Sequence, residues 1–223
     1  WYDLCREVYH ENRHSIRVKK EDKVVKNLER IFSATLRISN KKGFQAMSMR
    51  DLSREANLSM GALYSYFKSK EELLEMLQHQ RRTITKRILA EHIDAEYDPA
   101  ARLNAAVRTH LYLSEVMQPW FYFAYMETKN LSKKQQAEAI DSELFTENIF
   151  AEILAQGQAQ GVFVDHDSRL TASLIKSMLQ DWYLKRWKYA RRKISVDQYA
   201  QFVLKFVEAF ILNSTKIKQK KRK

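Results

Sequence analysis

The sequence of 223 residues has few of the residues that punctuate or cross-link a chain: four glycines, two prolines and one cysteine. The scarcity of Gly and Pro disfavours β-sandwiches, Rossmann folds and disorder. The single Cys5 excludes a disulfide framework within the chain and suits a reducing cytoplasm, where we expect the protein. The longest apolar run, Trp120 to Met126, is far too short to cross a bilayer, and the charged, amphipathic start does not have the pattern of a signal peptide. We therefore expect no membrane partner.

Positive charge, in contrast, is plentiful. The chain has 39 Lys and Arg residues against 27 Asp and Glu residues, a net charge of +12. This balance favours a polyanionic partner, nucleic acid first and an anionic membrane second. Residues 13–70 hold 14 basic and 5 acidic residues, and the tail 216–223 adds six basic ones, whereas residues 93–215 are nearly neutral. The excess charge therefore belongs to the N-terminal part of the chain and to its tail.

The hydrophobic pattern is helical almost throughout, with apolar residues recurring at the period of an α-helix. The pattern predicts an all-α protein with helices over 24–39, 48–56, 60–67, 70–92, 98–117, 120–130, 133–160, 168–191 and 195–215. Residues 1–20 are mixed and basic and indicate a loose helix or an arm. We place a domain boundary inside the helix 70–92, which belongs to both halves.

Two short helices joined by a three-residue turn form the most informative segment, residues 47–67. Leu52 and Ala56 lie on the inner face of the first helix, and Leu63 lies on that of the second. Asn57 stands where the chain must reverse and tolerates a left-handed conformation, and Ser59 is a good N-cap. This is the pattern of a helix-turn-helix, which places its second helix in the DNA major groove. The alternative is a plain helical hairpin whose tyrosines serve only in packing.

The block 28–77 resembles the TetR family of bacterial transcription regulators. The resemblance rests on the pair Gly43-Phe44, on Ser48 at a helix start, on Leu58-Ser59 at the end of the turn, on the run 61–67 (GALYSYF), and on the run 70–73 (KEEL). The block departs from the family pattern in having Asn57 where Gly is usual, Met60 in place of a polar residue and Ala62 in place of Thr.

The resemblance implies an N-terminal three-helix helix-turn-helix DNA-binding domain, 24–75, and a C-terminal helical ligand-binding and dimerisation bundle, 76–215. These are flanked by a basic extension, 1–23, and the basic tail, 216–223. Together with the exposed face of the second short helix, it implies a set of residues that contact operator DNA: Ser48, Arg50, Ser59, Met60, Gly61, Ala62, Tyr64, Ser65, Tyr66, Lys68 and Lys70.

The N-terminal extension has two interpretations. Its basic residues could form an arm that lies in the minor groove or along phosphates, as basic arms do in other helix-turn-helix proteins. They could equally form a solvated leader. The residues concerned are Arg13, Arg17, Lys19, Lys20, Lys23 and Lys26.

The C-terminal half is rich in aromatic residues, which suit either a plain core or a pocket for a bulky apolar effector. We predict a small apolar or acidic-amphipathic effector, such as a fatty acid or acyl thioester, with Arg108 or His110 binding the acidic group. The predicted ligand-binding residues are Arg108, His110, Tyr112, Met117, Trp120, Phe121, Phe123, Tyr125, Met178 and Trp182.

The last two long helices have apolar faces wide enough to need a partner surface, either the rest of the subunit or a second copy. A twofold dimer through these helices would present two recognition helices about one DNA turn apart. We therefore predict a homodimer.

No segment of the chain indicates catalysis. There is no phosphate-cradling Gly loop, and no nucleophile with a base can be argued. His10 and His14 have the spacing of metal ligands but lack a third ligand. We expect no enzyme, no cofactor and no metal. The predicted function is a ligand-responsive, dimeric transcriptional repressor released from a palindromic operator by its effector. The alternative is a basic helical module that binds acidic membranes or proteins without sequence-specific DNA recognition.

Overall fold

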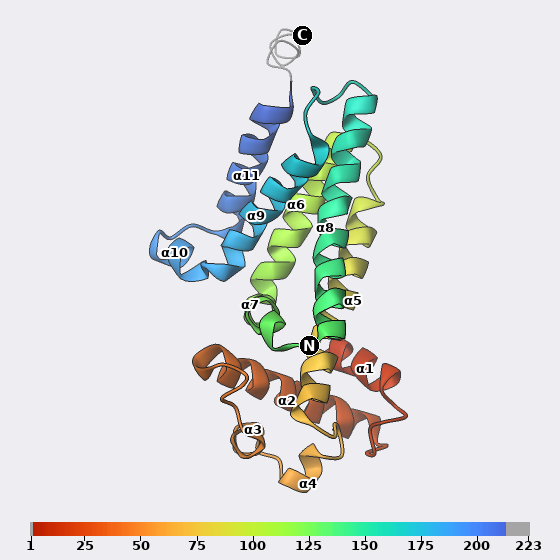
Figure 1. Cartoon of the computed structure of the whole chain (residues 1–223), viewed down its shortest axis with the longest axis vertical. Helices are drawn as coiled ribbons and strands as arrows, with labels where there is room; N and C mark the ends of the chain where they lie inside the picture. The colour runs from red at the N-terminus through yellow and green to blue at the C-terminus, as the bar shows by residue number, and fades with distance from the viewer. Residues whose placement is uncertain (1, 213–223) are drawn as a thin grey trace. The chain divides into compact units, whose positions relative to one another are not determined.

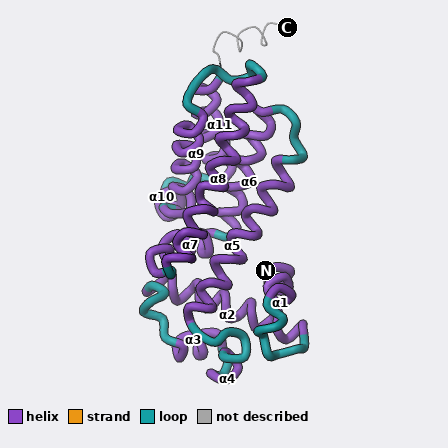
Figure 2. The backbone as a smooth tube through the Cα atoms, turned by 45° about the vertical axis from the view of Figure 1, so that its right-hand side comes forward, coloured by secondary structure: helices purple, strands orange, loops and turns teal. Residues whose placement is uncertain are grey.

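In a computed structural model, which describes residues 2–212, the chain folds into helices joined by short loops, and the described residues contain no strand (Figures 1 and 2). The all-α class predicted from the sequence is confirmed. The tail 216–223 and the predicted end of the last helix at 215 lie outside the described residues. The described helices are α1 (Tyr2–Glu11), α2 (Glu21–Lys42), α3 (Met49–Ala56), α4 (Met60–Leu63), α5 (Lys70–Ile93), α6 (Pro99–Val116), α7 (Gln118–Glu127), the 3-10 turn η1 (Thr128–Asn130), α8 (Lys133–Ala159), α9 (Ser168–Leu184), α10 (Arg186–Arg191) and α11 (Val196–Ile211).

The described residues form two compact units. Unit 1 contains residues 2–83 and 119–136, and unit 2 contains residues 84–118 and 137–212. The division falls inside α5, and neither unit is a single stretch of sequence. The exact limits of the predicted domains stay a prediction.

The core of unit 1 surrounds α2, whose inward face is apolar along nearly its whole length. Helices α1 and α3 pack against α2, and α7 closes the core from a distant part of the sequence. The ring of Trp120 on α7 packs 6.0 Å from that of Phe32, and its Nε1–H donates to the Leu77 carbonyl at 3.1 Å. The ring of Phe123 meets that of Phe44 edge-on. The aromatic run of α7 therefore completes the core of unit 1.

The N-terminal segment is folded rather than loose. Cys5, Val8 and Tyr9 of α1 are buried, as is Ile16 in the loop that follows. An apolar face of this kind favours packing on α2 over an extended solvated chain. The loose helix or arm expected over 1–20 is thus corrected to a packed helix and a loop anchored by Ile16.

The core of unit 2 is formed by apolar residues from α6, α8, α9 and α11 and from the end of α5. The single helix predicted over 168–191 is broken at Lys185, which lies outside the helical region at φ −119° and ψ 36°. The break places Tyr189 back against Trp182, with ring centroids 5.0 Å apart. In an unbroken helix, residues seven apart lie about 10 Å apart along the axis. The contact between the two rings therefore forms because the helix is broken, and it stabilises the bent arrangement of α9 and α10.

Candidate nucleic-acid interface

The start of α3 is fixed by a capping box. The Ser48 hydroxyl accepts a hydrogen bond from the Asp51 N–H at 3.1 Å, and the Asp51 carboxylate accepts one from the Ser48 N–H at 3.0 Å. Lys42 also donates to Asp51, at 2.8 Å. This bond, together with those from the Ser48 N–H and hydroxyl, holds the pKa of the Asp51 carboxyl well below its usual value. The side chain of Arg50, the second residue of α3, is exposed to solvent.

The turn between α3 and α4 is held in one conformation. Asn57 adopts the left-handed conformation expected of it, with φ 51° and ψ 52°. Its carbonyl accepts a hydrogen bond from Arg30 Nη2 at 2.7 Å, and the Ser53 hydroxyl donates to the Leu58 carbonyl. Contacts from both α2 and α3 therefore set the angle at which α4 leaves the turn.

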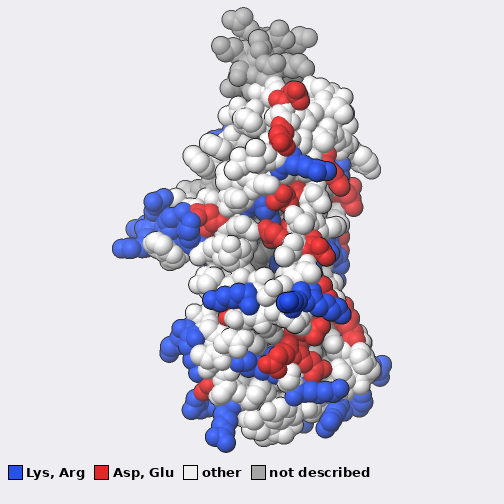
Figure 3. All heavy atoms as spheres, in the orientation of Figure 1, with Lys and Arg blue, Asp and Glu red and all other residues white. Residues whose placement is uncertain are grey.

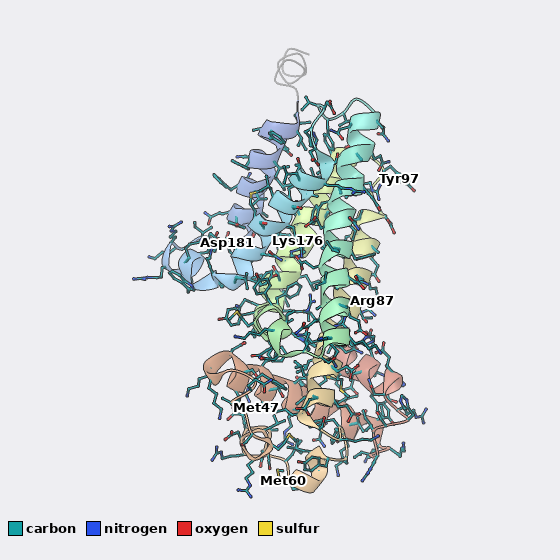
Figure 4. The ribbon with its side chains drawn as sticks, in the orientation of Figure 1. Met47, Met60, Arg87, Tyr97, Lys176 and Asp181 are labelled. Atoms are coloured by element: carbon teal, nitrogen blue, oxygen red, sulfur yellow. The ribbon has the colours of Figure 1, made fainter. Side chains whose placement is uncertain are left out.

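Helix α4 is short and exposes small and polar groups. Ser59 caps it by accepting a hydrogen bond from the Ala62 N–H at 3.1 Å. Gly61 is exposed, and a Cβ added there would meet nothing within 4 Å. The Tyr64 ring is 43% exposed. Met60 lies on the outer side of α4, at one end of unit 1 (Figure 4). A nucleic-acid backbone could approach α4 closely.

The predicted helix 60–67 is shorter in the structure, because α4 ends at Leu63. After it the chain tightens into turns in which the Ser65 and Tyr66 N–H groups donate to carbonyls three residues earlier. In a helix, adjacent side chains point about 100° apart. The turn replaces this spacing, and the side chains of Tyr66 and Phe67, although adjacent in sequence, are both buried.

Two predicted DNA-contact residues serve inside the fold. Tyr66 is only 1% exposed, and its hydroxyl accepts a hydrogen bond from Asn27 Nδ2 at 2.7 Å. Lys70 Nζ donates to the carbonyls of Phe44, Gln45 and Met47 at 3.0 to 3.1 Å. Tyr66 is thereby bonded to α2, and Lys70 is bonded to the segment that joins α2 to α3. Both side chains stabilise the fold, and we leave them out of the DNA interface proposed below.

Two residues of this assembly were not predicted from the sequence. Asn27 lies on the inward face of α2, and a polar residue within an apolar helical face is the signal that could have marked it. Glu127 on α7 accepts a hydrogen bond from the Phe44 N–H at 3.0 Å. Because 83 residues separate the two partners, no local pattern could have revealed this contact.

The charge around the interface is mainly positive. In Figure 3, blue basic groups lie on both sides of an uncharged patch on the part of unit 1 that carries α4. Three exposed basic residues lie close to α4 along the chain: Arg50, Arg54 and Lys68. Exposed small and polar groups between cations suit close contact with a phosphate backbone.

The predicted ligand-binding residues are spread over both units. In unit 1, Trp120, Phe121 and Phe123 are core residues, and Tyr125 is half exposed. In unit 2, His110, Met117 and Trp182 are buried, and Met178 is partly buried. Only two of the ten predicted residues line the apolar groove described below, and these are Arg108 and Tyr112.

Other kinds of site find no support in residues 2–212. No group of three His, Cys, Asp or Glu residues there could hold a metal ion. In the same part of the chain, no helix is both long enough and apolar enough to cross a membrane.

A capped helix that packs on α2, a left-handed turn and a second helix with exposed small residues define a helix-turn-helix DNA-binding protein. Residues 31–77 match the family model described as bacterial regulatory proteins, tetR family, and residues 96–207 match the tetracyclin repressor-like C-terminal domain. The chain belongs to the TetR family of bacterial regulators. The family assignment suggested by residues 28–77 is thereby confirmed.

The relatives agree with this assignment. The transcriptional regulator HbdR of Aromatoleum sp. (strain CIB) is 23% identical over 81% of this chain and 79% of that protein. The fold matches the structure of the ketosteroid transcriptional regulator KstR2 of Mycobacterium tuberculosis, with TM-score 0.75 and 20% identity over 90% of this chain and 99% of that one. It also matches AibR in complex with isovaleryl coenzyme A and operator DNA, with TM-score 0.70 and 18% identity over 82% and 97% of the two chains. The matched families and relatives are transcriptional regulators rather than enzymes, which confirms the predicted class of DNA-binding transcriptional regulator.

Proposed function

We propose that the protein is a dimeric, cytoplasmic repressor whose α3 and α4 bind a palindromic operator and whose effector releases it. The observation that carries the DNA-binding part is the exposed surface of α4, with open space at Gly61 beside the exposed Tyr64. The interface consists of residues that are exposed or partly exposed: Ser48, Arg50, Ser59, Met60, Gly61, Ala62, Tyr64, Ser65 and Lys68.

The experiment exploits the open space at Gly61. Gly61→Leu should leave the thermal unfolding midpoint unchanged or raised, because a Cβ added at this exposed position meets nothing within 4 Å and Leu favours helix over Gly. It should weaken binding to duplex DNA at least about tenfold by holding the backbone of α4 away from the duplex. Binding is measured by fluorescence anisotropy on an operator that the wild-type protein selects from a random library.

The matched control is Ala90→Leu, which adds similar bulk at an exposed position of α5. It should bind DNA as the wild type does. Equal affinity of Gly61→Leu and wild type would refute contact through α4. Failure of the wild type to select any sequence would favour the alternative of a basic module without sequence-specific recognition.

An apolar groove in unit 2 is our proposed effector site. It has a volume of about 590 Å³ and is lined by parts of α5 and α6, including Ile88, Leu113 and Val116. Arg108 also lines it and donates to Asn104 at 2.9 Å and to the Tyr112 hydroxyl at 3.1 Å. Glu91, His92 and Glu96 also line the groove, so among the described residues Arg108 is its only guanidinium but not its only charged or titratable group. The apolar wall suits an acyl chain, and Arg108 is the lining residue that suits an acidic group on it. The isovaleryl coenzyme A bound to the AibR neighbour has this chemistry.

We test the effector site by adding isovaleryl and stearoyl coenzyme A to the DNA complex. Release should need a higher concentration of the thioester for Arg108→Met, which keeps the apolar stem and removes the charge. Coupling between effector and DNA is typically about 1 to 3 kcal/mol. Arg169→Met, which removes an exposed charge on α9 outside the groove, should respond like the wild type. Equal responses of the two variants would place the effector elsewhere.

The proposed dimer uses α9 and α11, which pack against each other in unit 2. Each presents large apolar side chains to solvent at intervals of four residues, and each of these is about 60 to 70% exposed: Leu170 and Leu174 on α9, and Phe202, Phe206 and Phe210 on α11. We call these five residues the apolar stripe. A stripe of this kind in a soluble protein marks an interaction surface, and a second copy of the chain supplies an identical, self-complementary one.

A further inference from the structure

The N-terminal hairpin, which we define as α1 and the loop 12–20, is built as a rigid piece. Ile16 is fully buried. Asn12 Nδ2 donates to the Val8 carbonyl at 2.9 Å, and the Tyr9 hydroxyl donates to the Lys19 carbonyl at 3.2 Å. Lys19 Nζ in turn donates to the carbonyls of Arg13 and Ile16 at 3.1 and 3.0 Å. The loop therefore has one defined path over unit 1.

The hairpin is joined directly to the end of the recognition element. The Arg17 N–H donates to the Ser65 carbonyl at 2.9 Å. Ser65 belongs to the turn that ends α4, and its hydroxyl donates to the Ala62 carbonyl at 2.6 Å. The loop thus lies one hydrogen bond away from the surface assigned to DNA.

The charges of the loop are uncompensated. Arg13, Arg17 and Lys20 are exposed, and their side chains have no hydrogen-bond or ion-pair partner among residues 2–212. The nearby carboxylates are already engaged. Glu21 pairs with Arg6 at 2.7 Å, and Glu11 accepts a hydrogen bond from Gln80. Three exposed cations without internal partners in the described residues, on a loop bonded to Ser65, are thus available to bind an anion.

We propose that the N-terminal hairpin is a second DNA-contact element, in which Arg13 and Arg17 bind phosphates beyond the stretch of duplex that α3 and α4 contact. The inference rests on the proposed function. A duplex is favoured over other polyanions because the loop is bonded to Ser65 and so continues the surface of α4. Contacts to phosphates add affinity without sequence information. The folded hairpin would lengthen the footprint without changing the sequence that is read.

The test compares Arg13→Ala/Arg17→Ala with the wild type on the selected operator and on a random-sequence duplex, over a range of salt concentrations. Loss of two phosphate contacts should reduce the slope of log K against log[salt] by about 1.8. The variant should lose a similar factor in affinity for both duplexes, on the order of tenfold at about 0.1 M salt. Arg13→Lys/Arg17→Lys should keep most of the slope. The unfolding midpoint should not change, because neither side chain has a partner in the fold.

The control Arg191→Ala/Arg192→Ala removes the same charge from exposed positions on and next to α10 in unit 2, and it should keep the wild-type slope. An unchanged slope for the Arg13/Arg17 variant, with Gly61→Leu still defective, would overturn this inference and leave the proposed function standing. A wild-type protein that selects no DNA would instead overturn the proposed function. Binding to vesicles containing anionic phospholipid that depends on Arg13 and Arg17, with unchanged DNA affinity, would assign the hairpin to a membrane surface.

Discussion

At the scale of the single residue, Lys70 shows how a cation beside a binding surface can serve the fold. Its ammonium group donates to three successive parts of the chain between α2 and α3 and lies 4.9 Å from the centre of the Phe44 ring. Lys70→Ala would leave three carbonyl oxygens without this partner in a partly buried position. We expect a loss of about 1 to 3 kcal/mol in the free energy of unfolding, measured by urea denaturation.

Lys68 provides the comparison for Lys70. Its side chain is exposed and has no partner among residues 2–212, so Lys68→Ala should change the free energy of unfolding by less than about 0.5 kcal/mol. If the two variants were equally stable, the three hydrogen bonds of the Lys70 ammonium group would not contribute to the free energy of unfolding.

Sequence reasoning at this scale identified the exposed residues better than the buried ones. Ser59, Gly61 and Tyr64 lie on the outer surface of α4, as the helical pattern predicts. The same pattern places Tyr66 outside, because it predicts a helix that continues to residue 67, whereas α4 ends at Leu63. Its hydroxyl pairs with Asn27, 39 residues away, and a pairing across such a distance leaves no local periodicity to detect.

At the scale of the element, the capping box makes the start of α3 sensitive to acid. The hydrogen bond from Lys42 is the largest cause that lowers the pKa of Asp51 from its ordinary 3.8, followed by the bonds from Ser48. The charged carboxylate is thus favoured in the folded state. Its contribution to stability is present above pH 3.8 and is lost as the pH falls through the folded-state pKa.

The corresponding measurement is the titration of the Asp51 carboxyl by carbon NMR. Lys42→Ala should move the titration midpoint up toward 3.8, because the largest lowering interaction is removed. Lys41→Ala, at an exposed neighbour without a side-chain partner in the described residues, should leave the midpoint in place. A Lys42→Ala midpoint equal to that of the wild type would show that the box does not depend on this bond.

Elements with strong local signals were predicted from the sequence, whereas breaks that depend on distant contacts were not. Helix α6 begins at Pro99 after the Asp98 cap, and α8 begins at Lys133 after Ser132, as the capping pattern indicates. The break at Lys185 is not predicted by the helical pattern. It places Tyr189 against Trp182 and against Tyr199 from the following helix. Such a cluster is specified by tertiary packing and not by a helix-stop residue.

At the scale of the whole molecule, the proposed dimer predicts that the oligomeric state depends on the apolar stripe of α9 and α11. Phe206→Glu would place a charge in the middle of the proposed interface, where it would be buried without a partner at a cost of several kcal/mol. We expect the wild type to have twice the mass of one chain in light scattering at micromolar concentration and the variant to have the mass of one chain. DNA affinity should fall as well, because the two half-sites would no longer be bound by one linked particle.

The matched change outside the stripe is Tyr97→Glu. Tyr97 is 91% exposed in the loop before α6 and points away from the ribbon (Figure 4). This variant should remain a dimer, because it adds the same charge to a residue that already lies in solvent. A Phe206→Glu protein that still had the dimer mass would move the interface away from α11.

The discontinuity of unit 1 in the sequence also governs when this unit can fold. Its N-terminal stretch ends at residue 83, but the rings of Trp120 and Phe123 and the carboxylate of Glu127 come from α7. During synthesis from the N-terminus, the helix-turn-helix leaves the ribosome with part of its core still unmade. A fragment cut after residue 83 would expose Phe32 and Phe44 and leave the Phe44 N–H without its acceptor. We therefore expect competence to bind DNA only after α7 has been translated and has docked, and we expect a domain exchange with a relative to need residues 119–136 together with residues 2–83.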